Sequence, residues 1–184
     1  MAILTGIRRL AAAAAAIGTV AMAPDAPASA TIEYSVKAAY LAKFGIFVEW
    51  PKTAFGSPQS PVVLCIEGAD PFGDTLDKLV AGQRVGARPI VVRRVKVIAR
   101  DSGCAILFAG GSDAQSVDEA LAAVNGTGVL TVADTGHDGR SAIVEFVVQE
   151  GRVRFTIDGQ AAAQNGIVVS SHLLSLALSV KPKV

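Results

Sequence analysis

Residues that could do chemistry gather in one short stretch, VADTGHDG, at 132–139. The tripeptide Asp134-Thr-Gly matches the active-site motif of aspartic proteases, and Asp134, His137 and Asp138 together could chelate a metal ion. An aspartic protease needs two such loops, so that two carboxylates share one proton. Here one copy follows a strand of an α/β pattern, and Asp, Gly and His are ordinary turn formers. We therefore interpret the stretch as a turn, with neither catalytic nor metal-binding residues.

Other constellations that could support an active site are incomplete. Ser171 and His172 are adjacent and cannot serve each other as nucleophile and base, and the Gly-x-Ser-x-Gly elbow of serine hydrolases is missing. The segment EGADPFG at 67–73 resembles a phosphate-binding turn between strand and helix, but it lacks the glycine spacing and the P-loop lysine. The residues that follow it open with acids, which repel anions. The sequence therefore predicts a protein that is not an enzyme and that binds no cofactor.

The two cysteines, Cys65 and Cys104, permit three states. In an exported protein an even count favours a disulfide bond, which would close a loop of roughly forty residues and contribute about 4 kcal/mol. Free thiols are the alternative. A zinc site would need His137 and His172, and no pair of ligands has the close spacing of such sites.

The N-terminus has the pattern of a secretory signal peptide. Arg8 and Arg9 precede an apolar stretch at 10–23, and small residues at Ala28 and Ala30 fit signal-peptidase cleavage after Ala30. A twin-arginine signal and an uncleaved anchor are weaker alternatives. We therefore expect a signal peptide at 1–30 and a single exported domain at 31–184, with no membrane-spanning segment after cleavage.

The charge of the exported chain is balanced. Removing residues 1–30 takes away two arginines and one aspartate, which leaves fifteen basic and fifteen acidic side chains. Binding to nucleic acid requires an excess of basic charge that neutralises phosphates, and this chain has none. The composition therefore disfavours a nucleic-acid partner.

Apolar periodicity predicts helices alternating with strands. The helical stretches are 33–50, 70–82 and 112–126, and the strands are 62–68, 88–95, 104–110 and 128–134. In the first helix, Val36, Ala39, Tyr40, Phe44 and Phe47 recur at three- and four-residue spacing, and Pro51 ends the pattern. Ser112 or Asp113 is expected to cap the third helix.

The pattern changes after residue 140. Two β-rich runs at 141–158 predict a hairpin that turns at Glu150-Gly151. A small-residue segment follows at 159–166, and then a closing helix within 167–180, capped by Ser170 or Ser171. The predicted fold is α/β, with a mixed, mostly parallel sheet flanked by helices and an antiparallel hairpin toward the C-terminal edge.

Several stretches resemble the YfiR-like family over almost all of residues 33–180. They are, in family order, VKAAYLAKFGIFVEWP (36–51), LCIEGADPFGDTL (64–76), the strand that begins at Cys104, VLTVAD (129–134), IVEFVVQEGRVRFTID (143–158) and GIVVSSHLLSLA (166–177). The resemblance implies that Cys65 and Cys104 form the family's common disulfide bond. The chain departs from the family where a Gly-Gly often precedes the hairpin, and it lacks a second cysteine pair found in some relatives.

The resemblance also implies a function. A YfiR-like protein resides in the bacterial periplasm, where it binds the sensor part of an inner-membrane diguanylate cyclase and represses synthesis of cyclic di-GMP, and with it biofilm formation. The alternative is a periplasmic small-molecule-binding or envelope-assembly protein, with a site at the carboxyl ends of the parallel strands. The sequence leaves open whether the protein forms a homodimer.

Such a regulator must act by presenting a surface to its partner. We expect this surface on the closing segment, which mixes apolar and polar side chains: Asp158, Gln160, Gln164, Ile167 and Val169. Ile167 follows Gly166 in a loop-like stretch and is expected to be the exposed anchor. By contrast, Phe47 and Trp50 are expected to be structural, with Pro51 ending the helix.

Overall fold

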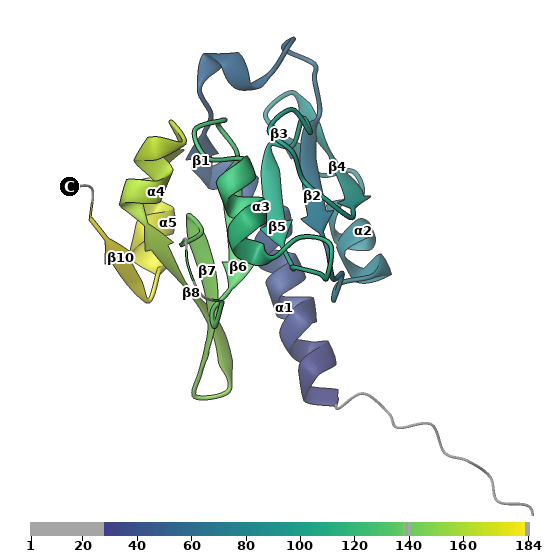
Figure 1. Cartoon of the computed structure of the whole chain (residues 1–184), viewed down its shortest axis with the longest axis vertical. Coiled ribbons are helices and arrows are strands. Elements are labelled where there is room, and N and C mark those ends of the chain that lie inside the picture. Colours follow the sequence, from purple (N-terminus) through teal and green to yellow (C-terminus); the bar gives the residue numbers. More distant parts are fainter. Residues whose placement is uncertain (1–27, 138, 140, 183–184) are drawn as a thin grey trace, which may run out of the picture.

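The computed structural model describes residues 28–137, 139 and 141–182 (Figure 1). The expected signal peptide lies outside the described residues except at 28–30, which form the start of α1 (Ala28–Phe44). Within the described ranges, no helix combines the length and the apolar character needed to cross a bilayer.

Among the described residues, eight strands form one mixed sheet, in the order β10-β8-β7-β6-β5-β2-β4-β3. Strands β2, β4, β5, β6 and β7 run parallel to one another. The edge strand β3 pairs with β4, and β8 pairs with β7, in the antiparallel direction, and β10 is parallel to β8. The predicted α/β fold is confirmed, including the hairpin toward the C-terminal edge. The bounds are β2 (Val62–Glu67), β3 (Arg84–Val85), β4 (Arg88–Val95), β5 (Ile106–Ala109), β6 (Leu130–Asp134), β7 (Val144–Gln149), β8 (Arg152–Asp158) and β10 (Ser179–Lys181).

Helices cover both faces of the sheet. Alternate residues of a strand point to opposite faces, so Leu64 and Ile66 of β2 pack with α1 and α2 (Asp74–Val80), whereas Cys65 packs with α3 (Val117–Ala123). In Figure 1, α3 lies in front of the sheet and α1 passes behind it. The two faces of one sheet thus account for two separate clusters of buried residues.

The hairpin turns where the sequence predicts. Glu150 and Gly151 both have positive φ, 51° and 70°. A two-residue turn with this backbone matches the right-handed twist of its strands. The tip of the hairpin extends beyond the rest of the sheet (Figure 1).

The first helix starts and ends earlier than the predicted range 33–50. It ends at Phe44, and a 3₁₀ turn, η1 (Gly45–Phe47), leads into β1 (Val48–Glu49). Gly45 is buried, and a Cβ there would lie 2.9 Å from Cγ2 of Val85. A glycine at this point both weakens the helix and lets the chain approach β3 closely. After Pro51, a second 3₁₀ turn, η2 (Lys52–Ala54), follows.

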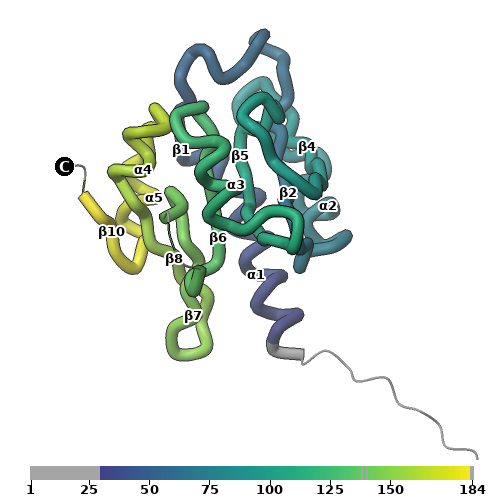
Figure 2. The backbone as a smooth tube through the Cα atoms, in the orientation of Figure 1, coloured from purple at the N-terminus to yellow at the C-terminus, as the bar shows by residue number. Residues whose placement is uncertain are grey.

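The predicted closing helix with its Ser170 cap is confirmed, but its expected extension to Val180 is wrong. The segment contains β9 (Val168–Val169), which pairs with β1, then α5 (Ser171–Leu176), capped by Ser170, and then β10. The preceding small-residue segment is a helix, α4 (Gly159–Gln164). Figure 2 follows the chain from β8 through α4 and α5 to β10 at the outer edge of the sheet. The predicted caps of α3 are also wrong, because Ser116 caps this helix together with Glu119.

Candidate functional site

Asp134, the aspartate of the Asp-Thr-Gly tripeptide, is bound by α1. It ends β6, where its Oδ1 accepts a hydrogen bond from Nζ of Lys37 at 2.7 Å and its Oδ2 accepts one from the Tyr34 hydroxyl at 3.0 Å. The Lys37 ammonium also pairs with Oε1 of Glu33 at 2.5 Å. Both carboxylate oxygens of Asp134 are therefore engaged by one helix, which fits a structural ion pair and not a protease dyad.

Burial and charge act in opposite directions on Lys37, whose side chain is only 4% exposed. Burial acts to lower the pKa of Lys37, but the hydrogen bonds to Asp134 and Glu33 outweigh it and raise that pKa above its ordinary value. Burial and the neighbouring Asp134 carboxylate likewise raise the pKa of Tyr34. The buried cation thus stays charged and joins α1 to the end of β6.

A hollow of about 260 Å³ lies beside Asp134, at the carboxyl ends of β2, β5 and β6. This end of a parallel sheet is where α/β proteins usually bind ligands. Nε2 of His137 lies 3.5 Å from Oε1 of Glu145. Asp138, the third member of the metal alternative, lies outside the described residues, and within the described part no three metal-ligand side chains cluster. The hollow lining comprises Tyr34, Ala69, Pro71, Phe108, Ala109, Gly110, Val117, Asp134, Thr135, Gly136 and His137.

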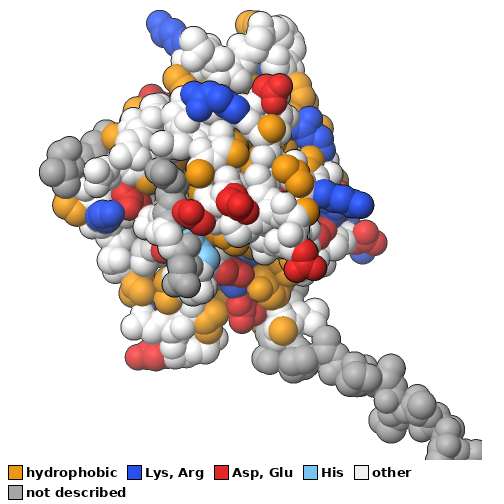
Figure 3. Space-filling view, viewed as in Figure 1, with side chains coloured by type: hydrophobic (Ala, Val, Ile, Leu, Met, Phe, Trp, Pro, Cys, Tyr) orange, Lys and Arg blue, Asp and Glu red, His pale blue; other side chains and the backbone are white. Residues whose placement is uncertain are grey.

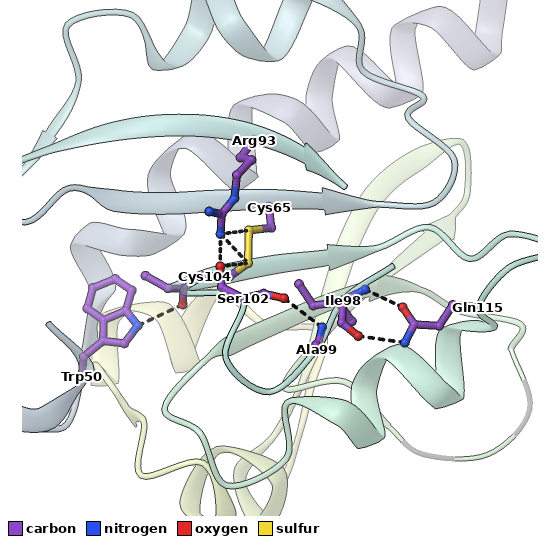
Figure 4. The surroundings of a disulfide bond; sticks show 9 residues. Trp50, Cys65, Arg93, Ile98, Ala99, Ser102, Cys104 and Gln115 are labelled. Atoms are coloured by element: carbon purple, nitrogen blue, oxygen red, sulfur yellow. Dashed lines mark hydrogen bonds between the residues drawn. A yellow bond between two sulfur atoms is a disulfide. The ribbon is translucent and has the colours of Figure 1, made fainter. Parts of the chain in front are cut away.

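Cys65 and Cys104 form a disulfide bond, as predicted, with their α-carbons 5.8 Å apart. Cys65 lies within β2, and Cys104 lies just before the neighbouring β5. Figure 4 shows Arg93, on the other neighbour of β2, directed at the two sulfur atoms, and its Nη2 lies 3.5 Å from each of them. The bond links two adjacent strands and has a cation beside it.

Trp50 lies near the disulfide, where the chain leaves β1. Its indole Nε1 donates a hydrogen bond to the Ala105 carbonyl at 3.0 Å, and its ring meets Phe55 edge-on. A half-buried indole with its donor satisfied fits the predicted structural role.

The closing segment supplies structural contacts where exposed anchors were expected. Ile167 is only 1% exposed, so the prediction that it is a surface residue is wrong. Asp158 is also buried: it caps α4 through the Ala161 amide at 2.9 Å and pairs with Nζ of Lys181 at 3.0 Å. Among the other members, Gln160 and Val169 are half-buried and Gln164 is exposed.

Two apolar hollows follow the outer face of α1 and share Val36. One, of about 540 Å³, lies between α1 and the hairpin, and the other, of about 280 Å³, lies between α1 and α5. We call them together the α1 groove. Figure 3 shows hydrophobic side chains gathered over the hairpin. The groove is lined by Ile32, Glu33, Val36, Ala39, Tyr40, Lys43, Phe44, Phe47, Val148, Gly151, Arg152, Val153, Leu173 and Leu176.

The α1 groove includes large apolar side chains that solvent reaches. Ile32 is 66% exposed, Val148 49%, Leu176 47% and Val36 39%. The sequence pattern contained this stripe, because Ile32, Val36, Ala39 and Tyr40 recur at helical spacing. The buried face of α1 carries Lys37, Ala38, Leu41 and Phe44. An apolar helix with a second, exposed apolar stripe was the missed signal.

The comparison with protein families gives one match. A family model described as YfiR/HmsC-like matches residues 34–178, which span the chain from α1 to the residue before β10. No curated protein matches the sequence.

Proposed function

The chain belongs to the YfiR/HmsC-like family, and from this premise we propose that it is an exported regulator, not an enzyme. It binds the periplasmic sensor part of an inner-membrane diguanylate cyclase and holds the cyclase inactive, as the YfiR-like resemblance implies. Release of the protein then raises cyclic di-GMP and promotes biofilm formation.

The α1 groove is the observation that carries this proposal. Contiguous exposed apolar surface rimmed by polar groups marks interaction sites on soluble proteins, because burying it on a partner is favourable. Val36 lies at the centre of the groove, and Phe47 and Tyr40 provide aromatic surface, which is enriched at binding hot spots. The groove is therefore the partner surface of the regulator.

The closing segment contributes less to the proposed partner surface than the α1 groove does. Gln164 is exposed and Gln160 and Val169 are half-buried, so these three can contribute to the edge of the partner surface. Asp158 and Ile167 act on the partner only through the fold, because they hold α4 and the residues after it in place.

Export to the periplasm is part of the same proposal. The predicted signal peptide, cleaved after Ala30, directs the chain there, and a disulfide bond between Cys65 and Cys104 suits an oxidising compartment. A regulator in the periplasm reaches the sensor part of the cyclase and not its cytoplasmic catalytic part.

The test is recovery of the partner from membranes. The tagged exported protein is incubated with solubilised membranes of the source cells, beside Val36→Glu in the groove and Val97→Glu as a control that is also exposed and apolar. We expect the wild type and Val97→Glu to recover a diguanylate cyclase with a periplasmic sensor, and Val36→Glu to recover far less. Recovery of no cyclase by the wild type would refute the proposal.

The hollow beside Asp134 favours a second candidate function, the binding of a small molecule. Its place at the carboxyl ends of three strands is the supporting observation. In this case the exported protein carries a metabolite that co-purifies from the periplasm, and Val117→Trp, which fills the hollow, abolishes that co-purification. Mass spectrometry of the native protein, which detects any bound metabolite, checks this candidate.

A further inference from the structure

We infer that the α1 groove receives an amphipathic α-helix of about four turns with acidic flanks. The inference rests on the proposed function, because this helix belongs to the sensor part of the partner. Four features of the groove support it: its length, the nature of its walls, its aromatic floor and the charge of its rim.

The length of the groove follows from α1. Its lining begins at Ile32 and reaches Phe47, just past the end of the helix. With a rise of 1.5 Å per residue, this stretch extends about 22 Å, the length of a helix of about 15 residues. Because the two hollows share Val36, one rigid element can occupy both.

The walls favour a helix over a strand. Two of the walls, α1 and α5, are helices whose backbone groups are bonded internally, so they offer side chains only. A strand in the groove would leave backbone donors and acceptors unpaired along these walls. A helix satisfies its own backbone and can place apolar residues at spacings of three, four and seven on the floor of the groove.

The floor of the groove is suited to such anchors. Tyr40 and Phe44 stack with ring centroids 6.0 Å apart, and Phe44 in turn contacts Phe146 and Phe155. This aromatic cluster forms a rigid base below the exposed side chains of Val36 and Leu176. A rigid apolar surface loses little conformational freedom when a partner binds, and this lowers the entropic cost of binding.

The rim of the groove carries unbalanced positive charge. Lys43 and Arg152 are exposed, one at each hollow. The acidic lining residue, Glu33, shares Lys37 with Asp134, so the groove lining keeps a net charge of +1 from Lys43, Arg152 and Glu33. Acidic side chains flanking the apolar face of the bound helix therefore complement the rim, and this attraction weakens as salt screens it.

Synthetic peptides test the inference directly. The probe is a fluorescent peptide of about 16 residues with leucines at helical spacing and glutamates on both flanks, compared with a copy whose flanks are lysines and a copy broken by a central proline. Binding to the exported protein is measured by fluorescence polarisation. We expect the glutamate peptide to bind about tenfold more tightly than either copy at about 50 mM salt, with a smaller difference from the lysine copy at about 500 mM.

Matched variants locate the binding. Val36→Glu and Arg152→Glu should each weaken binding of the glutamate peptide, whereas Val97→Glu and Lys96→Glu, which lie away from the groove, should not. Thermal melting of each variant shows that the fold is intact. Equal binding of the three peptides, or equal loss in the control variants, overturns the inference.

Three further outcomes test the occupant of the groove and separate the inference from the proposed function. If Val36→Glu turns a dimer of the exported protein into a monomer in sedimentation, the groove holds a second copy of the chain and the inference is wrong. If the glutamate peptide fails to bind while membranes still yield the cyclase, the partner uses another element and only the inference fails. If the peptide binds as expected and no cyclase is recovered, the inference about the groove stands and the proposed partner is wrong.

Discussion

The ammonium of Lys37 lies 2.7 Å from Oδ1 of Asp134, and 97 residues of chain separate the two. This pair joins α1 to the carboxyl end of β6 and places the outer stripe of α1 beside the hairpin. The aspartate that resembles a protease residue is thus part of the framework that positions the α1 groove.

Breaking this pair should destabilise the protein. Asp134→Asn removes one of the two carboxylates that pair with the buried ammonium of Lys37, and removal of one partner from a buried ion pair costs about 3 kcal/mol. Glu33→Gln is the control, because it removes the other carboxylate that pairs with Lys37 and leaves Asp134 in place. Urea unfolding measures both variants. A free energy of unfolding for Asp134→Asn equal to that of the wild type would contradict the structural role of the pair.

Glu67 should make the protein less stable as pH rises. The side chain is fully buried at the end of β2; its Oε2 accepts the Gly111 amide at 3.2 Å, and its Oε1 has no hydrogen-bond partner among the described residues. Burial raises the pKa of Glu67 above its ordinary value of 4.5, and the Gly111 hydrogen bond opposes this only in part.

The sign of the pH effect follows from the raised pKa. The folded state binds the Glu67 proton more tightly than the unfolded state, so this group's contribution is fully present below about pH 4.5 and is lost as pH rises through the folded pKa. Glu67→Gln keeps the acceptor for Gly111 and removes the charge. We expect it to raise the melting temperature at pH 7 and to leave it nearly unchanged at pH 3.5. Equal melting temperatures of variant and wild type at pH 7 would show that the buried charge has no cost.

Reduction of the disulfide should depend on Arg93. An external thiol attacks Sγ of Cys104, because Cys104 is half-buried whereas Cys65 is fully buried. The Cys65 sulfur then leaves as a thiolate, which the guanidinium of Arg93 stabilises. Arg93→Gln should slow reduction by dithiothreitol several-fold, while Lys96→Gln should not. The rate of appearance of free thiols measures this, and a rate that Arg93→Gln leaves unchanged would exclude the proposed influence of the guanidinium.

Substitutions of Ile167 and Gln164 should differ in their effect on the free energy of unfolding. Ile167 is buried against the core, so Ile167→Ala should lower the free energy of unfolding by about 2–5 kcal/mol. Gln164 is exposed at the end of α4, so Gln164→Ala should change stability by no more than about 0.5 kcal/mol. Denaturant unfolding of the two variants checks the contrast. A stable Ile167→Ala variant would show that this side chain does not support the core.

Local patterns in the sequence predicted the central sheet and the hairpin, because these elements depend on nearby residues. The apolar runs around Leu64 and Leu107 are short and bounded by turn residues. The residue pair Glu150-Gly151 favours a tight turn without help from distant residues. The disulfide could be anticipated because the family resemblance supplied the pairing. The cap of α3 was also within reach, since Ser116 and Glu119 have the spacing of a capping box.

The C-terminal elements depend on distant partners that no local pattern reveals. Val168 and Val169 form a strand because β1 lies beside them, and Val180 pairs with Ile157 at the edge of the sheet. The same residues also fit a helical pattern, and the sequence alone does not show that β1 and β8 lie beside them. The role of Lys37 was missed for a related reason, because a lysine in a helix is usually solvated and its partner Asp134 is distant in the chain.

The central claim is that the α1 groove mediates repression of a membrane diguanylate cyclase, and the most direct test is the effect of added protein on cyclic di-GMP synthesis. The assay uses spheroplasts that contain the cyclase and lack this protein, because their periplasmic face is open to solution. The account predicts that wild-type protein and Val97→Glu lower the cyclic di-GMP level in proportion to the fraction of cyclase molecules to which they are bound. Val36→Glu should leave the level unchanged. A level that wild-type protein leaves unchanged, or that Val36→Glu lowers as effectively as the wild type, would contradict the account.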